Sequence, residues 1–235
     1  MIKRIVALFM IFNLVACAEL QQVVDSLPQS DSILSNTDIA SGLRQALDLG
    51  IDKQVTKLTQ TDGFFKNDLV KILLPEELQK VDDALRKIGL SNLADEGLKV
   101  LNRAAEDAVK EATPIFINAV KDITFDDAKN ILLGEDSAAT SYLTTKTQIE
   151  LYAKFKPVIN KSFSSVGADQ IWTNLITKYN NLPLTKNVNT DLTDYVTGEA
   201  LKGVYTMIAV EEKEIRNKVS SRSTDLLKKV FALQD

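Results

Sequence analysis

Histidine is absent from all 235 residues, and cysteine occurs once, at Cys17. Without histidine, the chain cannot form a serine–histidine–aspartate or cysteine–histidine catalytic arrangement. Zinc and iron sites built on imidazole are excluded for the same reason, and a lone cysteine cannot form a disulfide within one chain. Carboxylate, lysine, tyrosine or serine–lysine chemistry remains open, as does an oxygen-ligated Ca²⁺ or Mg²⁺ ion.

Glycine and positive charge are also in short supply. The 9 glycines are scattered, and none of them forms the phosphate-binding patterns G-x-G-x-x-G or G-x-x-x-x-G-K-[ST]. The 28 Lys and Arg residues face 32 Asp and Glu residues, which gives a formal charge of −4. An acidic surface, with a sequence pI near 5.1, argues against binding to nucleic acid. It also argues against electrostatic adhesion to anionic lipid headgroups.

The first seventeen residues have the layout of a bacterial export signal. Lys3 and Arg4 form a positive start, an unbroken apolar run covers residues 5–12, and Leu14-Val15-Ala16-Cys17 closes the segment. The apolar run is shorter than the ~20 residues of a membrane-spanning helix. We therefore predict a signal peptide over residues 1–16.

A cysteine directly after Leu-x-Ala resembles the lipobox of bacterial lipoproteins, in which the thiol takes up a diacylglycerol and becomes the new N-terminus. The resemblance implies lipidation at Cys17 and attachment to a membrane through N-terminal acyl chains. An aspartate directly after the lipidated cysteine resembles an inner-membrane retention signal, but this position is Ala18 here. We therefore expect the protein to be anchored in the outer membrane and to face the periplasm. The alternative is an ordinary secreted protein with an incidental cysteine.

Residues 17–36 have no sustained periodicity and are predicted to be the lipidated N-terminus and a tether, with a docked arm as the alternative. Residues 37–235 then carry helical patterns throughout. Apolar residues at steps of three and four predict a helix from Asp38 to about Leu58, which ends at the turn Thr61-Asp62-Gly63. The segment from Phe64 to Leu74 is ambiguous between an extended piece and a short helix.

Local signals place the remaining helix boundaries. Further helices are predicted from Pro75 to Gly89, from Ser91 to an interruption at Pro114, over 125–133 after the capping residue Thr124, and from Ser137 to Val166 with a kink or split at Pro157. Three more follow: around 171–179, from Asp191, and over 226–233 after Ser223-Thr224-Asp225. No strand pair with a tight Asn-Gly or Asp-Gly turn occurs. The sequence predicts a single all-α domain, an irregular bundle of about eight helices.

Several phrases resemble a bacterial family known as a domain of unknown function, the DUF4197-type family, many of whose members carry lipoprotein signals. The phrases are Thr61-Asp62-Gly63-Phe64, Leu74-Pro75, Asn102-Arg103-Ala104-Ala105-Glu106, Asp127-Ala128-Lys129-Asn130-Ile131-Leu132, Ala138-Ala139-Thr140-Ser141-Tyr142 and residues 224–231. The resemblance covers nearly the whole mature chain, residues 37–233, and it implies a helical extracytoplasmic domain. It implies no activity, substrate or catalytic residue.

One polar cluster is the main candidate site. Asn102 and Glu106, and likewise Arg103 and Asp107, are four residues apart on one predicted helix. Such a cluster could hold an anionic or amide-bearing ligand. We favour the alternative, a hydrogen-bond network between helices in which carboxylates hold the arginine.

Two acidic groups are weaker candidates. The run from Glu211 to Arg216 could supply paired carboxylates, but adjacent residues diverge by about 100° around a helix, and alternating charge is typical of a solvated face. Helix capping explains Asp126-Asp127, and Asp122 with this pair lacks the loop pattern of a calcium site. We therefore predict no metal site and no cofactor.

The sequence favours a non-enzymatic, lipid-anchored binding or structural domain of the cell envelope. Its expected partners are the membrane and possible envelope proteins, and not nucleic acid. One alternative is a carrier that holds a hydrophobic ligand in a cavity between helices. Another is a hydrolase that uses carboxylates and a divalent metal, which would bring acidic residues from different helices into one cleft.

Overall fold

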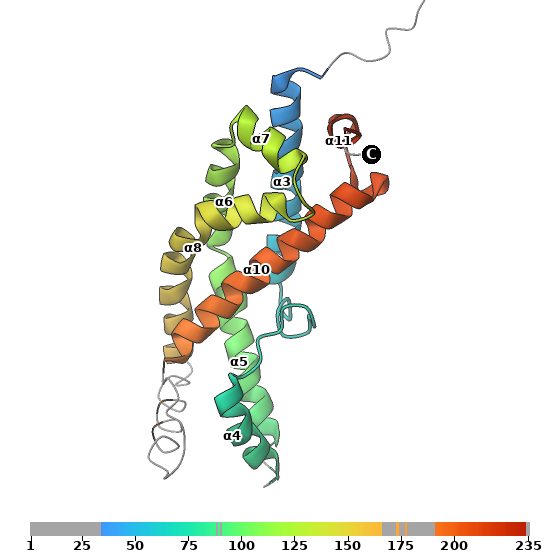
Figure 1. The fold of residues 1–235 in the computed structure, drawn as a ribbon. Helices are drawn as coiled ribbons and strands as arrows, with labels where there is room; N and C mark the ends of the chain where they lie inside the picture. The colour runs from blue at the N-terminus through green and yellow to red at the C-terminus, as the bar shows by residue number, and fades with distance from the viewer. Residues whose placement is uncertain are drawn as a thin grey trace, which may run out of the picture. The chain divides into compact units, whose positions relative to one another are not determined.

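The computed structural model describes residues 34–87, 89, 91–165, 173, 177 and 191–233. Within this part of the chain there are eight α-helices and no strand, which confirms the all-α prediction (Figure 1). The helices are α3 (Asn36–Thr59), α4 (Glu76–Lys87), α5 (Ser91–Val109), α6 (Ala112–Lys121), α7 (Phe125–Leu132), α8 (Ala138–Ser165), α10 (Leu192–Asn217) and α11 (Asp225–Phe231). A short 3-10 helix, η1 (Val219–Ser221), joins the last two. Residues Asn36–Asp235 group into one unit of contacts.

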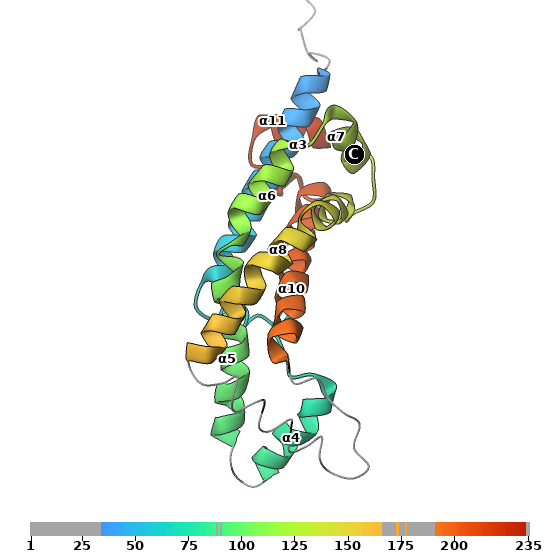
Figure 2. The same cartoon turned by 90° about the vertical axis from the view of Figure 1, so that its left-hand side faces the viewer.

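The long helices α8 and α10 pack against each other, and both contact α5 (Figure 2). Helix α3 packs along α10 and also contacts α6, α7 and α11, while α4 packs on the early part of α5. The core between them is aliphatic and aromatic, and its largest buried side chains include Phe64, Phe116, Phe155, Phe163, Leu43, Leu58 and Leu101. Burial of such side chains is the main source of the stability of a chain that has no disulfide.

Helix α3 ends at the turn that the sequence predicted. Asp62 adopts the left-handed conformation, with a φ of 70°, and the Gly63 N–H donates to the Gln60 carbonyl at 2.9 Å. A Cβ atom at Gly63 would lie 2.5 Å from the backbone oxygen of Leu58, so only glycine fits there. The turn directs the chain back so that Phe64 becomes fully buried.

The ambiguous segment after this turn forms neither a helix nor a paired strand. Residues 64–70 make successive turns, and residues 71–75 are irregular. Pro75 then precedes α4, and Gly89 follows that helix with a φ of +82°, in agreement with the predicted start and end.

The two interior prolines have different effects. Near Pro114 the chain breaks into α5 and α6, and the proline falls in the first turn of α6, where its missing N–H costs no hydrogen bond. By contrast, α8 continues through Pro157, so the predicted alternative of a split is wrong. Pro157 deprives the Ala153 carbonyl of its donor, but both residues are exposed and water can replace the bond.

Side-chain caps begin the later helices as expected. Thr124 and Asp127 form a complete capping box at α7, Asp191 accepts from the Asp194 N–H at α10, and Thr224 accepts from the Leu227 N–H at α11. The helix predicted around residues 171–179 lies outside the described residues, apart from positions 173 and 177.

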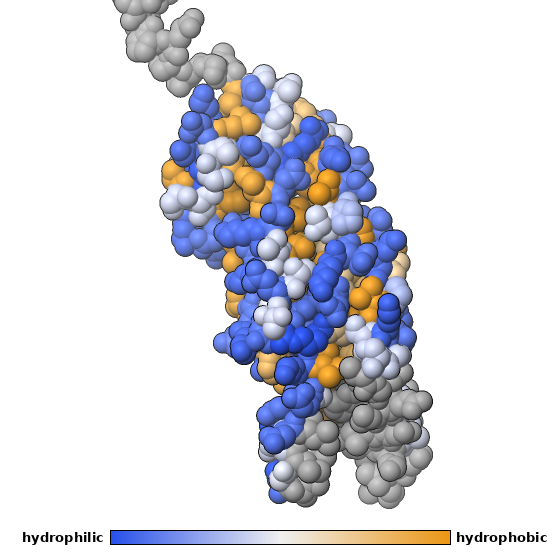
Figure 3. All heavy atoms as spheres, turned by 180° about the vertical axis from the view of Figure 1, so that it is seen from behind, coloured by the Kyte–Doolittle hydropathy of each residue, from blue (hydrophilic) through white to orange (hydrophobic). Residues whose placement is uncertain are grey.

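On the face seen in Figure 3, hydrophilic residues surround separate, smaller hydrophobic patches. Individual large apolar side chains are nevertheless exposed, with Ile149 at 88%, Leu133 at 65% and Leu69 at 63%. None of the helices in the described ranges combines the length and the hydropathy needed to span a membrane.

Candidate functional site

Asn102, the first residue of the predicted polar cluster, is fully buried on α5. Its side-chain amide holds both backbone groups of Ile72: Oδ1 accepts from the Ile72 N–H at 2.8 Å, and Nδ2 donates to the Ile72 carbonyl at 2.9 Å. The same nitrogen donates to the Leu98 carbonyl one turn back on α5 at 2.8 Å. The Asn102 side chain thus pairs the backbone groups of Ile72, as a neighbouring β-strand would do in a sheet.

Glu106 and Arg103 hold the preceding turn in a similar way. Glu106 is buried, and its Oε1 accepts the backbone N–H groups of Phe64 at 3.1 Å and Phe65 at 3.4 Å. Arg103 donates to the other Glu106 oxygen and to Asp62, both at 2.5 Å. Hydrogen bonds from Lys66 and then Arg103 lower the pKa of Asp62, whereas the two carboxylates raise the pKa of Arg103, Glu106 having the larger effect.

Asp107 does not belong to this network. It is exposed, and among the described residues its side chain pairs only with Lys110 on its own helix, at 2.8 Å. The structure therefore brings Asn102, Arg103 and Glu106 together and leaves Asp107 at the surface. The favoured interpretation was a network between helices in which carboxylates hold the arginine. Carboxylates do hold Arg103, but the network joins α5 to the irregular 62–72 segment and not to another helix.

The run of charged residues in α10 is not a solvated face, and that interpretation was wrong. Glu211, Glu212 and Arg216 are each only 7% exposed. Glu212 accepts from the backbone N–H groups of Ala139 at 2.9 Å and Thr140 at 2.8 Å, and from the Thr140 hydroxyl at 2.7 Å. These amides belong to the first turn of α8, whose partial positive charge favours a carboxylate.

Arg216 makes the complementary contact at the end of α7. It donates to the carbonyl oxygens of Ile131 at 2.8 Å and Leu132 at 3.2 Å, and to Glu212 at 2.8 Å and 3.0 Å. One buried ion pair on α10 therefore caps the end of α7 and the start of α8 together.

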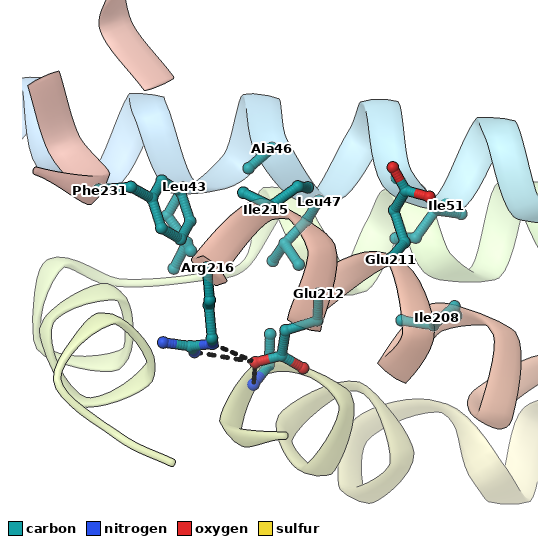
Figure 4. A pocket seen from close by; sticks show the side chains of 12 residues that line it. Leu43, Ala46, Leu47, Ile51, Ile208, Glu211, Glu212, Ile215, Arg216 and Phe231 are labelled. Carbon is teal, nitrogen blue, oxygen red and sulfur yellow. Dashed lines mark hydrogen bonds and ion pairs between the residues drawn. The ribbon is translucent and has the colours of Figure 1, made fainter. Parts of the chain in front are cut away.

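Glu211 points the other way, toward α3, as Figure 4 shows. Its carboxylate accepts from Lys53 at 2.7 Å and from the Gln54 amide at 2.6 Å. Adjacent glutamates thus diverge around the helix as predicted, and each lies in its own set of contacts. No group of three or more Asp, Glu, Cys or His residues in the described ranges is arranged to hold a metal ion.

A small cavity lies between these clusters, lined mainly by apolar side chains of α3 and α10 such as Leu47, Ile51 and Ile208 (Figure 4). Its volume is about 20 Å³, which accommodates about one water molecule. Ligand pockets for drug-sized molecules are far larger, on the order of 300–1,000 Å³. The cavity does not favour the carrier hypothesis.

A larger concavity lies at the surface, between residues 69–76 and the first half of α10. It has a volume of about 650 Å³ and is lined by apolar side chains such as Leu69 and Leu73 and by charged ones such as Lys71 and Glu76. Tyr195, on the α10 side, donates its hydroxyl to the Leu73 carbonyl at 2.9 Å. We call this concavity the α10 groove.

A surface cluster on α8 and α10 combines a lysine and a tyrosine. Lys156 donates to Asp194 at 3.0 Å and to the Tyr152 hydroxyl at 3.3 Å, and Tyr152 also donates to Asp194. The hydrogen bond to Asp194, followed by that to Tyr152, raises the pKa of Lys156. A lysine that serves as a general base needs the opposite shift, so this cluster joins two helices and does not resemble a catalytic dyad.

Sequence reasoning missed Arg222, which is only 2% exposed. It donates to the carbonyls of Ile215 at 3.1 Å and Arg216 at 2.8 Å, in the last turn of α10, and lies over the Phe231 ring. A basic residue between the long helix predicted from Asp191 and the helix predicted over 226–233 was the available signal. Cys17, the predicted lipidation site, lies outside the described residues.

Residues 33–232 match a family described as "Protein of unknown function (DUF4197)". The chain belongs to this family. The match covers the described helical unit almost completely, and with it Asn102, Arg103, Glu106, Glu212 and Arg216. No curated protein and no solved structure shows significant similarity to the chain.

Proposed function

We propose that this chain is a lipid-anchored protein of the bacterial cell envelope whose helical domain binds another envelope component. The observation that carries the anchor is the position of Cys17, the only cysteine, directly after Leu14-Val15-Ala16 and an apolar run with a basic start. Acyl chains on Cys17 would tether residues 37–235 to a bilayer, and Ala18 favours the outer membrane with the domain in the periplasm.

The contacts of the buried carboxylates support binding over catalysis. Glu106 accepts two backbone amides and a guanidinium, and Glu212 accepts two backbone amides, a hydroxyl and a guanidinium. Glu211 is held by Lys53 and Gln54. A catalytic acid or base needs a proton-exchanging face toward the substrate, and these carboxylates instead satisfy the backbone and neighbouring cations.

The α10 groove supports the binding role because it is a surface concavity of about 650 Å³, large enough to receive part of a partner protein. Its lining combines apolar, polar and charged side chains, a composition suited to a protein surface more than to a single small apolar ligand.

Two measurements test the proposal with the full chain expressed in a bacterium that processes lipoproteins. Mass spectrometry of the native protein should find Cys17 as an acylated N-terminus, and an intact N-terminal Met1 with a free thiol would refute the anchor. Crosslinking in cells should then enrich the same envelope proteins with wild type more strongly than with Cys17→Ser. Equal, weak recovery from both would contradict the binding role.

A further inference from the structure

We propose that the α10 groove binds an extended polypeptide segment of its partner, which pairs with the backbone at Leu73 and places an acidic side chain against Lys71 and a basic one against Glu76. This inference rests on the proposed binding function and specifies the chemistry of the partner. Backbone geometry, charge and exposed apolar surface support it separately.

The backbone contacts of Ile72 define one edge of the segment. Its N–H and its carbonyl both face Asn102, which is the arrangement of an extended chain. In an extended chain the neighbouring residues direct their N–H and carbonyl groups to the opposite side. The Leu73 N–H and the Lys71 carbonyl therefore face away from α5, and neither has a hydrogen-bond partner among the described residues. The segment offers an unpaired edge to an added strand.

The Leu73 carbonyl identifies which side this edge faces. It accepts the hydroxyl of Tyr195, and Tyr195 lines the α10 groove. The free edge of residues 71–73 therefore opens into the groove. A carbonyl has two lone pairs, so Leu73 can accept from a partner N–H while Tyr195 stays in place. The occupant thus lies between the segment and α10.

Charge complementarity then orients the occupant. Lys71 and Glu76 line opposite ends of residues 71–76, and neither makes an ion pair with any described residue. Lys71 instead lies over the Phe65 ring, 4.8 Å from its centre. Glu76 follows Lys71 by five residues, so the backbone positions of these two charges can be at most about 17 Å apart, at 3.3–3.4 Å per residue. An extended segment of matching length with opposite charges at its ends satisfies both side chains.

Exposed apolar side chains supply the remaining contact. Leu69 and Leu73 line the groove and are 63% and 54% exposed, although most large apolar side chains of the described chain are buried. Alternate residues of an extended occupant would face these leucines, as in other complexes formed by strand addition. The occupant should therefore carry apolar residues between its two charged ends.

The probe for this proposal is a fluorescent hexapeptide, acetyl-Asp-Val-Thr-Val-Thr-Lys-amide, measured by anisotropy with the full chain. Saturable binding is expected, and N-methylation of its central amides should weaken binding about tenfold or more, because the methyl groups block backbone pairing. Binding that tolerates both N-methylation and a scrambled sequence would overturn strand addition.

Charge reversal tests the orientation. Lys71→Glu should weaken binding of the probe about tenfold and should restore binding of a peptide whose terminal aspartate is replaced by lysine. Lys154→Glu, an exposed position on α8, is the matched control and should change neither affinity. Failure of the reversed peptide to recover affinity for the Lys71→Glu variant would contradict the proposed contact.

The backbone donor is tested by Leu73→Pro, which removes the N–H, against Leu73→Ala, which keeps it. Only the proline variant should abolish binding. If that variant loses its cooperative melt, the charge-reversal pair decides the question. If no variant changes peptide binding but envelope proteins are still enriched in a Cys17-dependent way, the groove proposal is refuted and the proposed function stands. If the peptide results are as expected but the Cys17-dependent enrichment is absent, the proposed function fails while the groove still binds peptide.

Discussion

Glu212 and Arg216 lie one turn apart on α10 and are joined at 2.8 Å, yet each is bonded to the end of a different helix. The carboxylate meets the start of α8 and the guanidinium meets the end of α7. These two side chains neutralise each other's charge and together fix the end of α7 and the start of α8 against α10. This pair explains why an acidic run that looks solvated is buried.

We predict that Glu212→Gln destabilises the domain by about 3–5 kcal/mol, because it leaves the buried Arg216 without its counter-charge. The free energy of unfolding in urea is the measurement. Glu214→Gln, which disturbs only the exposed pair with Lys218, is the control and should cost less than about 1 kcal/mol. Equal losses in the two variants would contradict the role given to Glu212.

Asn102→Ala should destabilise the domain by about 2–4 kcal/mol, because the buried N–H and carbonyl of Ile72 lose their partners. Asp107→Ala on the same helix should change stability by no more than about 0.5 kcal/mol, since its only ion pair is exposed. Thermal and urea unfolding of the two variants compare them directly. Hydrogen exchange at Ile72 should accelerate in the first variant only, and unchanged exchange there would refute the contact.

Two glycines of α10 should respond oppositely to alanine. A Cβ atom at Gly203 would lie 2.6 Å from the Phe64 ring, so Gly203→Ala should cost about 1–3 kcal/mol. A Cβ atom at Gly198 would meet no side chain or other element of the described chain within 4 Å, and Gly198→Ala should gain up to about 1 kcal/mol from helix propensity. Adding Phe64→Leu should recover part of the loss at Gly203 in a double-mutant cycle. A fully additive cycle would show that Phe64 is not the obstacle.

Acid should weaken the capping box of α7. Hydrogen bonds from the Thr124 hydroxyl and then the Thr124 N–H lower the pKa of Asp127 below its ordinary value of 3.8. A carboxyl with a lower pKa in the folded state stabilises it above the unfolded pKa, and this contribution disappears as the pH falls through the folded pKa. Asp127→Asn should therefore flatten the dependence of the free energy of unfolding on pH below about pH 4.

Thr124→Ala provides the control for that experiment. It removes the hydroxyl that has the largest effect on the Asp127 carboxyl, so Asp127→Asn should flatten the pH dependence less in this background than in wild type. An identical effect in both backgrounds would contradict the assigned cause.

Helix boundaries were predictable where the signal is local. Thr124 with Asp127, Thr224 before α11 and Gly89 after α4 act within four residues of their own backbone, so their chemistry can be read from adjacent positions. The 64–74 segment could not be resolved in this way, because its conformation depends on Asn102 and Glu106 from α5.

Export through residues 1–16 and acylation of Cys17 remain predictions from the sequence, as does the helix around 171–179. The clustering of Asn102, Arg103 and Glu106 was also foreseeable, because a helix places residues three and four apart on one side. Which of the four residues face inward could not be predicted. Arg103 and Asp107 lie on the same side of the helix, but only Arg103 has the 62–72 segment opposite it.

Composition and short-range pattern alone establish that this chain is helical, acidic and without imidazole or disulfide chemistry, because those properties belong to single residues or neighbouring turns. Burial of Glu211, Glu212 and Arg216 was decided by tertiary structure. Apart from the Glu212–Arg216 pair itself, their side chains bind groups that lie 72 or more residues away along the chain. Thr140 is 72 residues from Glu212, and Gln54 is 157 residues from Glu211. A carboxylate is stable inside a protein only when donors from other elements converge on it, and no sequence pattern reports that convergence.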